Sequence, residues 1–144
     1  MFVRHILETK GHIVATVSQG ATLTDVAGLL AEHGVGALVV SDDGETIAGI
    51  VSERDLARAV AAQGADALGL SVTDAMTSQV STCGPDDTID SLMETMTSRR
   101  IRHLPVTVDG KLVGIVSIGD VVKNRLAELQ TESKVLHDYL YSGR

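Results

Sequence analysis

Apolar residues follow two spacings along the chain. Where they recur every three or four positions, the pattern predicts amphipathic helices with one buried face. Where they stand side by side, as in residues 37–40, it predicts strands that are buried on both sides. The predicted helices span residues 1–10, 22–33, 52–63, 88–98 and 118–139. The predicted strands span residues 12–17, 35–41, 46–51, 80–83, 101–108 and 112–116.

The same order of elements occurs twice. Residues 49–56, Gly-Ile-Val-Ser-Glu-Arg-Asp-Leu, return as residues 114–121, Gly-Ile-Val-Ser-Ile-Gly-Asp-Val, and Thr22 aligns with Thr88. Each copy is predicted to fold in the order β-α-β-β-α, with an Asp-Gly turn between its last two strands. We therefore expect an α/β (α+β) protein that is built from two copies of one unit.

The domain boundaries follow from this repeat. We assign residues 1–66, which include the short N-terminal helix, to the first repeat and residues 67–126 to the second. The apolar pattern of the last helix continues past the end of the repeat. Residues 127–144 are therefore predicted to form a C-terminal helical extension.

These motifs resemble those of the cystathionine beta-synthase (CBS) domain. Its hallmarks are a strand ending in Leu-Pro-Val, an Asp-Gly turn and Gly-h-h-Ser/Thr-x-x-Asp, where h is apolar. Residues 104–106, 109–110 and 114–120 match them in the second copy, whereas residues 38–40 of the first copy lack the proline. The resemblance covers about residues 6–126. It implies a tandem CBS pair of the stand-alone bacterial type, whose repeats pack about a pseudo-twofold axis and leave two clefts.

The repeated Ser-x-x-Asp has two interpretations. Ser52 and Ser117 could cap the helices that follow, with Asp55 and Asp120 completing a capping box. The resemblance implies instead that each Asp binds the two ribose hydroxyls of a nucleotide, with the Ser beside it. A carboxylate offers two acceptor oxygens to such a diol, and a helix N-terminus offers free N–H groups to an anion. The two roles are compatible.

A basic cluster, residues 99–103, precedes the Leu-Pro-Val motif. If these residues lie on a strand, Arg100 and Arg102 point to one side and Ile101 and His103 to the other. They could be a solvated edge that discourages strand pairing. The resemblance implies that Arg102 and His103 meet nucleotide phosphates, a role that suits cationic side chains.

The resemblance also implies which residues line each cleft. The cleft ending at Asp120 ranks first, because Ile118 and Gly119 leave it open, whereas Arg54 could block the other cleft or reach a phosphate. The expected members of the Asp120 cleft are Thr16, Val35, Gly36, Ala37, Arg102, His103, Ser117, Ile118, Gly119 and Asp120. The cleft ending at Asp55 would use Ser52, Arg54, Asp55, Thr82 and Ile101, together with Arg102 and His103.

Composition narrows the function classes. A net charge of −7 disfavours nucleic acid and anionic membranes as partners, and no apolar stretch is long enough to span a bilayer. With one Phe, two Tyr and no Trp, a bound base would lie between aliphatic side chains. The N-terminus does not resemble a signal peptide and Cys83 is the only cysteine, so we expect a cytoplasmic protein.

The expected function is therefore a non-enzymatic sensor of an adenosine-containing nucleotide: AMP, ADP, ATP or NAD(H). The sequence offers no general base, nucleophile or metal-ligand spacing that would indicate an enzyme. The alternative is a ligand-independent interaction or dimerisation module. The protein that such a module would regulate is unknown.

The last helix carries an apolar stripe that the repeat does not need. Its members recur at alternating intervals of four and three residues, as in coiled coils. The stripe could fold back on its own subunit, or it could form a homodimer contact. It consists of Val122, Leu126, Leu129, Ser133, Leu136 and Leu140.

Overall fold

The computed structural model describes residues 1–142 as a mixed α/β protein, which confirms the expected fold class. Its helices are α1 (Val3–Lys10), α2 (Leu23–His33), α3 (Glu53–Gln63), α4 (Val72–Ala75), α5 (Ile89–Arg99) and α6 (Ile118–Ser142), with a 3-10 helix at Gly64–Gly69. Its strands are β1 (Thr16–Val17), β2 (Ala37–Val40), β3 (Gly49–Ser52), β4 (His103–Val108) and β5 (Lys111–Ser117).

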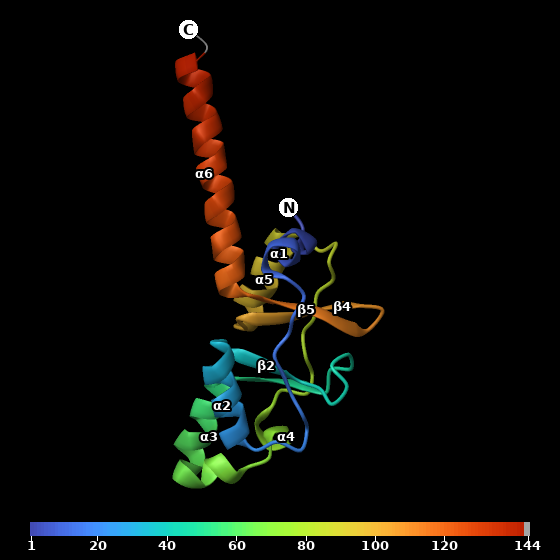
Figure 1. Ribbon diagram of the computed structural model, residues 1–144. Helices are drawn as coiled ribbons and strands as arrows, with labels where there is room; N and C mark the ends of the chain where they lie inside the picture. Colours follow the sequence, from blue (N-terminus) through green and yellow to red (C-terminus); the bar gives the residue numbers. More distant parts are fainter. Residues whose placement is uncertain (143–144) are drawn as a thin grey trace.

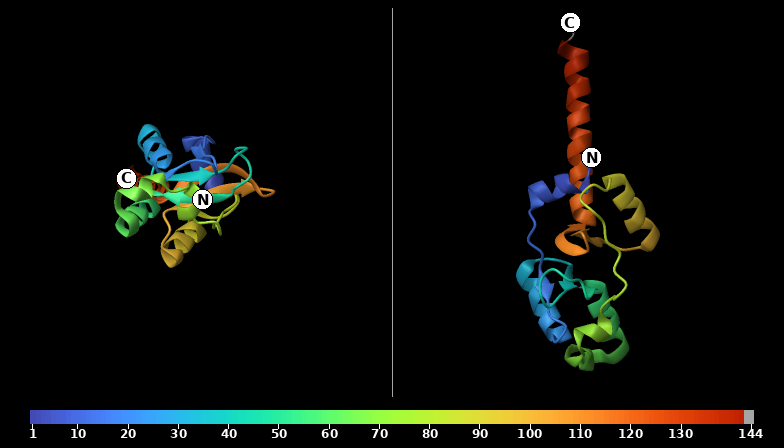
Figure 2. Two further views of the ribbon diagram at one scale, coloured as in Figure 1. Left: turned by 90° about the horizontal axis from the view of Figure 1, so that it is seen from below. Right: turned by 90° about the vertical axis from the view of Figure 1, so that its right-hand side faces the viewer.

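The elements form two lobes of similar design (Figure 1). The first lobe holds the sheet β1-β2-β3, in which β1 is parallel to β2, with α2, α3 and α4 around it. The second lobe holds the antiparallel pair β4-β5 with α1, α5 and the start of α6. Two chain segments, 11–15 and 76–82, connect the lobes, one on each side (Figure 2, right).

The lobes exchange their entry helices. Val3, Ile6 and Leu7 of α1 lie in the core of the second lobe, although α1 precedes the first repeat in the sequence. Conversely, Val72 of α4 is fully buried in the core of the first lobe. The packing thus crosses the boundary at residues 66 and 67 that the repeat predicts, and that boundary stays a prediction.

Two glycines allow these exchanged helices to approach the sheets. A Cβ atom on Gly114 would lie 2.7 Å from Cδ2 of Leu7. One on Gly49 would lie 2.5 Å from the sulfur of Met76 and 2.9 Å from the carbonyl oxygen of Thr77. Both distances are shorter than a van der Waals contact, so each copy of the octamer begins with glycine for the same steric reason.

Two predicted strands are mostly absent. In 12–17 only Thr16 and Val17 pair with β2, and in 80–83 only Cys83 forms an isolated bridge, to Val106. Both segments cross between the lobes, where most of their backbone has no neighbouring strand.

The predicted strand alternation in the basic cluster is wrong for its first residues. Arg100 ends α5 in the left-handed conformation, with φ 54°, and β4 begins only at His103. The arginines of residues 99–102 are exposed.

Helix α6 leaves the second lobe and extends away from both lobes (Figure 1). Its first turn is anchored by Val121, which is fully buried, and Arg125 forms ion pairs with Asp90 and Glu128. Farther out, Leu129 is 52% exposed and Leu136 is 59% exposed, so the stripe does not fold back on its own subunit. None of the helices within residues 1–142 combines the length and hydrophobicity that a bilayer crossing requires.

The close approach of α4 to Gly49 can be tested by adding a methyl group. Gly49→Ala should lower the free energy of unfolding by about 1–3 kcal/mol, because the backbone at Thr77 has to move. The matched control is Gly28→Ala in α2, where the added Cβ meets no atom within 4 Å. That substitution should raise stability by up to about 1 kcal/mol, since alanine favours the helix. Urea unfolding of both variants measures the difference, and equal effects would contradict the steric explanation.

Candidate functional site

Each Ser-x-x-Asp motif forms reciprocal hydrogen bonds at the start of a helix. The backbone N–H of Ser117 donates to Oδ2 of Asp120 at 2.9 Å, and the N–H of Asp120 donates to Oγ of Ser117 at 3.2 Å. In the first copy the same bonds join Ser52 and Asp55, at 2.9 and 3.4 Å. The capping interpretation is therefore confirmed in both copies. Oδ1 of Asp120 accepts no hydrogen bond from residues 1–142, so an acceptor remains available.

Each motif begins at the end of a strand, and the neighbouring antiparallel strand brings further predicted site residues beside it. His103 pairs with Ser117 across β4 and β5, and the N–H of Ile118 donates to the carbonyl of Arg102 at 2.8 Å. In the first lobe Ala37 pairs with Ser52, and Gly36 accepts the N–H of Glu53 at 2.9 Å. Each half of the candidate site is thus a strand end beside a helix N-terminus.

The two halves meet at Gly36. A Cβ on Gly36 would lie 3.3 Å from Cε1 of His103 and 3.3 Å from Oε1 of Glu53. A side chain at this position would therefore push against the imidazole. The absence of one allows the strand end of the first lobe to lie directly against the second.

Lys10 is a member of the site that the sequence analysis did not identify. Its Nζ lies 2.6 Å from Oδ2 of Asp120 and donates to the carbonyl of Ile115 at 3.0 Å. Burial alone would raise the pKa of Asp120, but the hydrogen bonds from Lys10 and from the Ser117 N–H outweigh it and hold the pKa below its usual value. The ionised carboxylate therefore stabilises the fold at neutral pH, and this contribution is lost as pH falls through its lowered pKa.

The surroundings of His103 favour its neutral imidazole. Burial lowers the pKa of its imidazole and the positive charge of Lys10 lowers it further, while Asp120 and Glu53 oppose the shift only in part. A neutral imidazole can donate one hydrogen bond to a phosphate oxygen, but it contributes no charge unless the ligand raises its pKa.

The surroundings of Asp55 differ from those of Asp120. Oδ2 of Asp55 accepts from both the N–H and the Oγ of Ser52, and Asp55 forms no ion pair among the described residues. Arg54 is directed across the lobes, where its guanidinium donates to the carbonyl of Arg100 at 3.3 Å. Thr82 is exposed and Ile101 half-buried, and no described contact joins either of them to Asp55.

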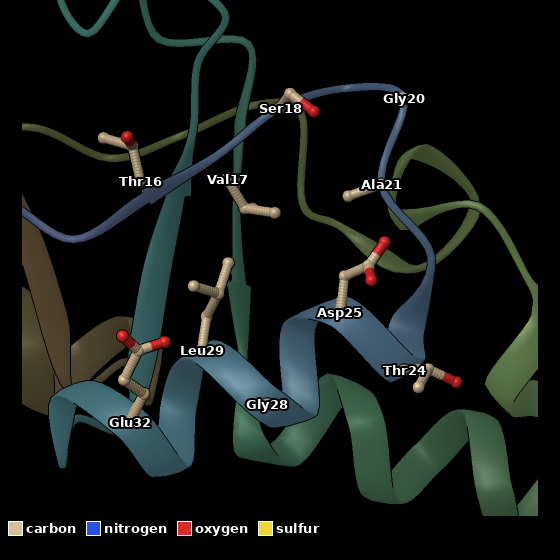
Figure 3. A pocket seen from close by; sticks show the side chains of 10 residues that line it. All are labelled: Thr16, Val17, Ser18, Gly20, Ala21, Thr24, Asp25, Gly28, Leu29 and Glu32. Carbon is tan, nitrogen blue, oxygen red and sulfur yellow. The ribbon is translucent and has the colours of Figure 1, made fainter.

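Thr16 lies in β1, and its assignment to the Asp120 cleft stays a prediction. It lines a groove of about 660 Å³ between β1 and α2 (Figure 3). Asp25 and Glu32 also line this groove, and their charges disfavour a phosphate there. Within the described residues no contact joins Thr16 to Asp120. Val35, Ile118 and Gly119 are exposed, and their assignment to the Asp120 cleft stays a prediction.

Other reactive groups lie apart from the site. The thiol of Cys83 is buried, and burial followed by the negative charge of Asp87 raises its pKa to about 12. Among residues 1–142, His, Cys, Asp and Glu side chains form no group of three or more that could hold a metal ion.

Comparison with known proteins gives matches over most of the chain. The family model described as "CBS domain" matches residues 4–62 and 72–127. A CBS domain-containing protein of Arabidopsis thaliana, described as mitochondrial, is 39% identical over 126 residues, which are 85% of this chain and 61% of that protein. This chain thus spans less than two thirds of that relative.

Two solved structures match the fold as well. A CBS-domain containing protein from Agrobacterium tumefaciens is 50% identical with a TM-score of 0.84, covering 87% of this chain and 99% of the other. A CBS domain protein from Pyrobaculum aerophilum, solved in complex with AMP, is 30% identical with a TM-score of 0.77, covering 91% of this chain and 99% of the other.

The placement of Lys10 beside His103 can be tested without a ligand. An NMR titration should give His103 a pKa below the ordinary value of about 6.5. In Lys10→Met this pKa should rise, because the variant removes a nearby positive charge and leaves Asp120 unpaired. The control Lys111→Met removes a lysine that pairs with Glu45 at the surface, and it should leave the His103 titration unchanged. An unchanged titration in Lys10→Met would contradict the ion pair at the cleft.

Proposed function

Because this chain belongs to the CBS-domain family and contains two CBS domains, we propose that it is a non-catalytic sensor of an adenosine-containing ligand. The ligand is an adenine nucleotide such as AMP, ADP, ATP or NAD(H), and it binds in the cleft between the lobes that ends at Asp120. Binding changes the arrangement of the lobes or of α6, and a protein partner responds to that change.

One observation carries the proposal: the carboxylate of Asp120 lies at the start of α6 near His103, and the imidazole of His103 lies against Gly36 at a strand end of the other lobe. The ribose hydroxyls donate to Asp120, whose Oδ1 is available for this. The phosphates lie near Arg102 and His103, and the positive end of the α6 dipole favours negative charge there. The base lies against small and aliphatic residues of the first lobe, Val35, Gly36 and Ala37, where Gly36 leaves room beside His103.

Two further facts support a binding role over a catalytic one. A relative of 30% identity has been solved with AMP bound. In this chain the one thiol is buried with a raised pKa, which makes it a poor nucleophile.

The interaction alternative is favoured by a separate observation, the uncovered stripe of α6. We propose that its occupant is the same helix of a second copy, so that the protein is a homodimer. The alternating intervals of four and three residues fit a partner helix with equal spacing, which a second copy supplies. Ser133 is the one polar member of the stripe, and a parallel pair places the two serine hydroxyls opposite each other rather than against leucine. The sensor and the dimer are compatible.

Ligand binding can be measured as a gain in stability. AMP at a hundredfold its dissociation constant should raise the free energy of unfolding of the parent protein by about 2.7 kcal/mol. Asp120→Asn should lose this gain, because the ribose loses its charged acceptor, while the ligand-free fold loses only about 1 kcal/mol. The matched control is Asp55→Asn, which should keep the gain. Equal stabilisation of Asp120→Asn and the parent would refute the ribose assignment, and the absence of any shift with AMP, ADP, ATP, NAD or NADH would favour the interaction module.

The dimer contact can be tested on α6 alone. Leu129→Glu places a charge on the stripe and should raise the dissociation constant of a dimer of two 15.1 kDa chains by about a hundredfold or more. Thr131→Glu adds the same charge two residues away, on the opposite side of the helix, and should leave the dimer intact. Sedimentation equilibrium gives both constants. A Leu129→Glu variant that dimerises as tightly as the parent would show that the stripe is not the contact.

A further inference from the structure

Lys10 forms an ion pair with Asp120, the carboxylate that the proposed function assigns to the ribose. Its ammonium group lies 2.6 Å from Oδ2 of Asp120, although 110 positions separate the two residues in the sequence. Both side chains are partly buried, at 34% and 23% exposed. A second hydrogen bond, to the carbonyl of Ile115, holds the ammonium group in place.

The fold fixes Lys10 at this point. It is the last residue of α1, whose buried side chains Val3, Ile6 and Leu7 anchor the helix in the second lobe. Gly11 follows in a conformation with φ 97°, where the chain turns toward the first lobe. Only the flexible four-carbon stem of Lys10 is therefore free to move within the cleft.

This ion pair is an obstacle to an uncharged ligand. A ribose that donates both hydroxyls to Asp120 needs Oδ2 as well as the open Oδ1, so it has to share Oδ2 with the ammonium group or displace it. The displaced ammonium group would then remain partly buried, and among residues 1–142 it has no acidic partner at hydrogen-bond distance other than Asp120. A ligand with a phosphate group removes this cost, because the phosphate is a new partner for the ammonium group.

We propose that Lys10 is the residue by which the Asp120 cleft selects phosphorylated adenosine ligands over uncharged or cationic ones. When a nucleotide binds, Lys10 releases Asp120 to the ribose and pairs with the phosphate. Adenosine offers no such partner, and S-adenosylmethionine brings a further positive charge. This inference rests on the proposed function, and it narrows the ligand class to adenine nucleotides.

The second cleft provides an internal comparison. Asp55 is held by Ser52 alone and forms no ion pair within the described residues. A nucleoside could bind there without displacing a cation. Charge selection should therefore be a property of the Asp120 cleft, and measurements on that cleft are best made in an Asp55→Asn background.

The experiment is calorimetric titration of Asp55→Asn protein with AMP and with adenosine. Lys10→Met should bind AMP more weakly and adenosine more tightly, so the ratio of the adenosine Kd to the AMP Kd should fall by about tenfold. Lys10→Arg keeps the charge and should retain most of the ratio. Lys111→Met, which removes a surface ion pair with Glu45, should not change it. Thermal unfolding of each variant establishes that it is folded.

The outcomes separate this inference from the proposed function. A fall in the ratio confined to Lys10→Met supports charge selection by Lys10. If the protein binds both ligands but Lys10→Met leaves the ratio unchanged, or weakens both ligands equally, the selection is refuted while the sensor stands. If the protein with Lys10 intact binds neither ligand at the Asp120 cleft, the proposed function fails at that site and the inference fails with it.

Discussion

The packing of α1 on the second lobe is the contact on which the rest of the site depends. Leu7 lies so close to Gly114 that no side chain fits between them, and this fixes the position of the helix over β5. Lys10, one turn later, then reaches Asp120. If α1 packed on the lobe that follows it in the sequence, its last residue would lie far from this carboxylate. The exchange of entry helices therefore determines the ion pair at Asp120 as well as the fold.

The same exchange leaves the two motif carboxylates, Asp55 and Asp120, with different partners. Met76 lies over Gly49 as Leu7 lies over Gly114, so the steric arrangement repeats. The charges do not, because Asp55 has only Ser52 as a partner within residues 1–142. A duplicated unit can thus keep its backbone contacts, which the glycines enforce, while its two carboxylates acquire different electrostatics.

Capping and ligand binding do not compete for Asp120. A cap is worth about 1 kcal/mol and uses a single carboxylate oxygen, Oδ2, leaving the other for a ligand. The backbone bond from Ser117 also orients the carboxylate before any ligand arrives. Capping is therefore compatible with the proposed binding role, and its presence in both copies does not contradict it.

Much of the fold could be predicted from the local sequence pattern, and the features that could not be predicted have physical reasons. Helical periodicity predicts α2, α3 and α5 to within one or two residues, because α2 and α5 each bury one face and α3 packs Leu56 and Ala59 partly buried against the core of its lobe. The apolar runs at 12–17 and 80–83 resemble strands, but they are crossing segments with few backbone partners. The motif residues from Ser117 to Asp120 and their neighbours Arg102 and His103 are brought together as a local hairpin requires. Lys10 could not be found in this way, because its ion pair depends on an exchange between lobes that no short stretch of sequence encodes.

Helix α6 connects this chemistry to the outer surface. Asp120 lies in its first turn, Val121 is buried beside it, and the whole helix is about 37 Å long. The first turn is tied to α1 by the ion pair of Asp120 with Lys10, and the next turn is tied to α5 by Arg125 and Asp90. A ligand that takes Asp120 from Lys10 removes the first tie and leaves the second. It can move the helix only if it binds two arrangements unequally, and the proposed release of Lys10 by a phosphate would supply such a difference.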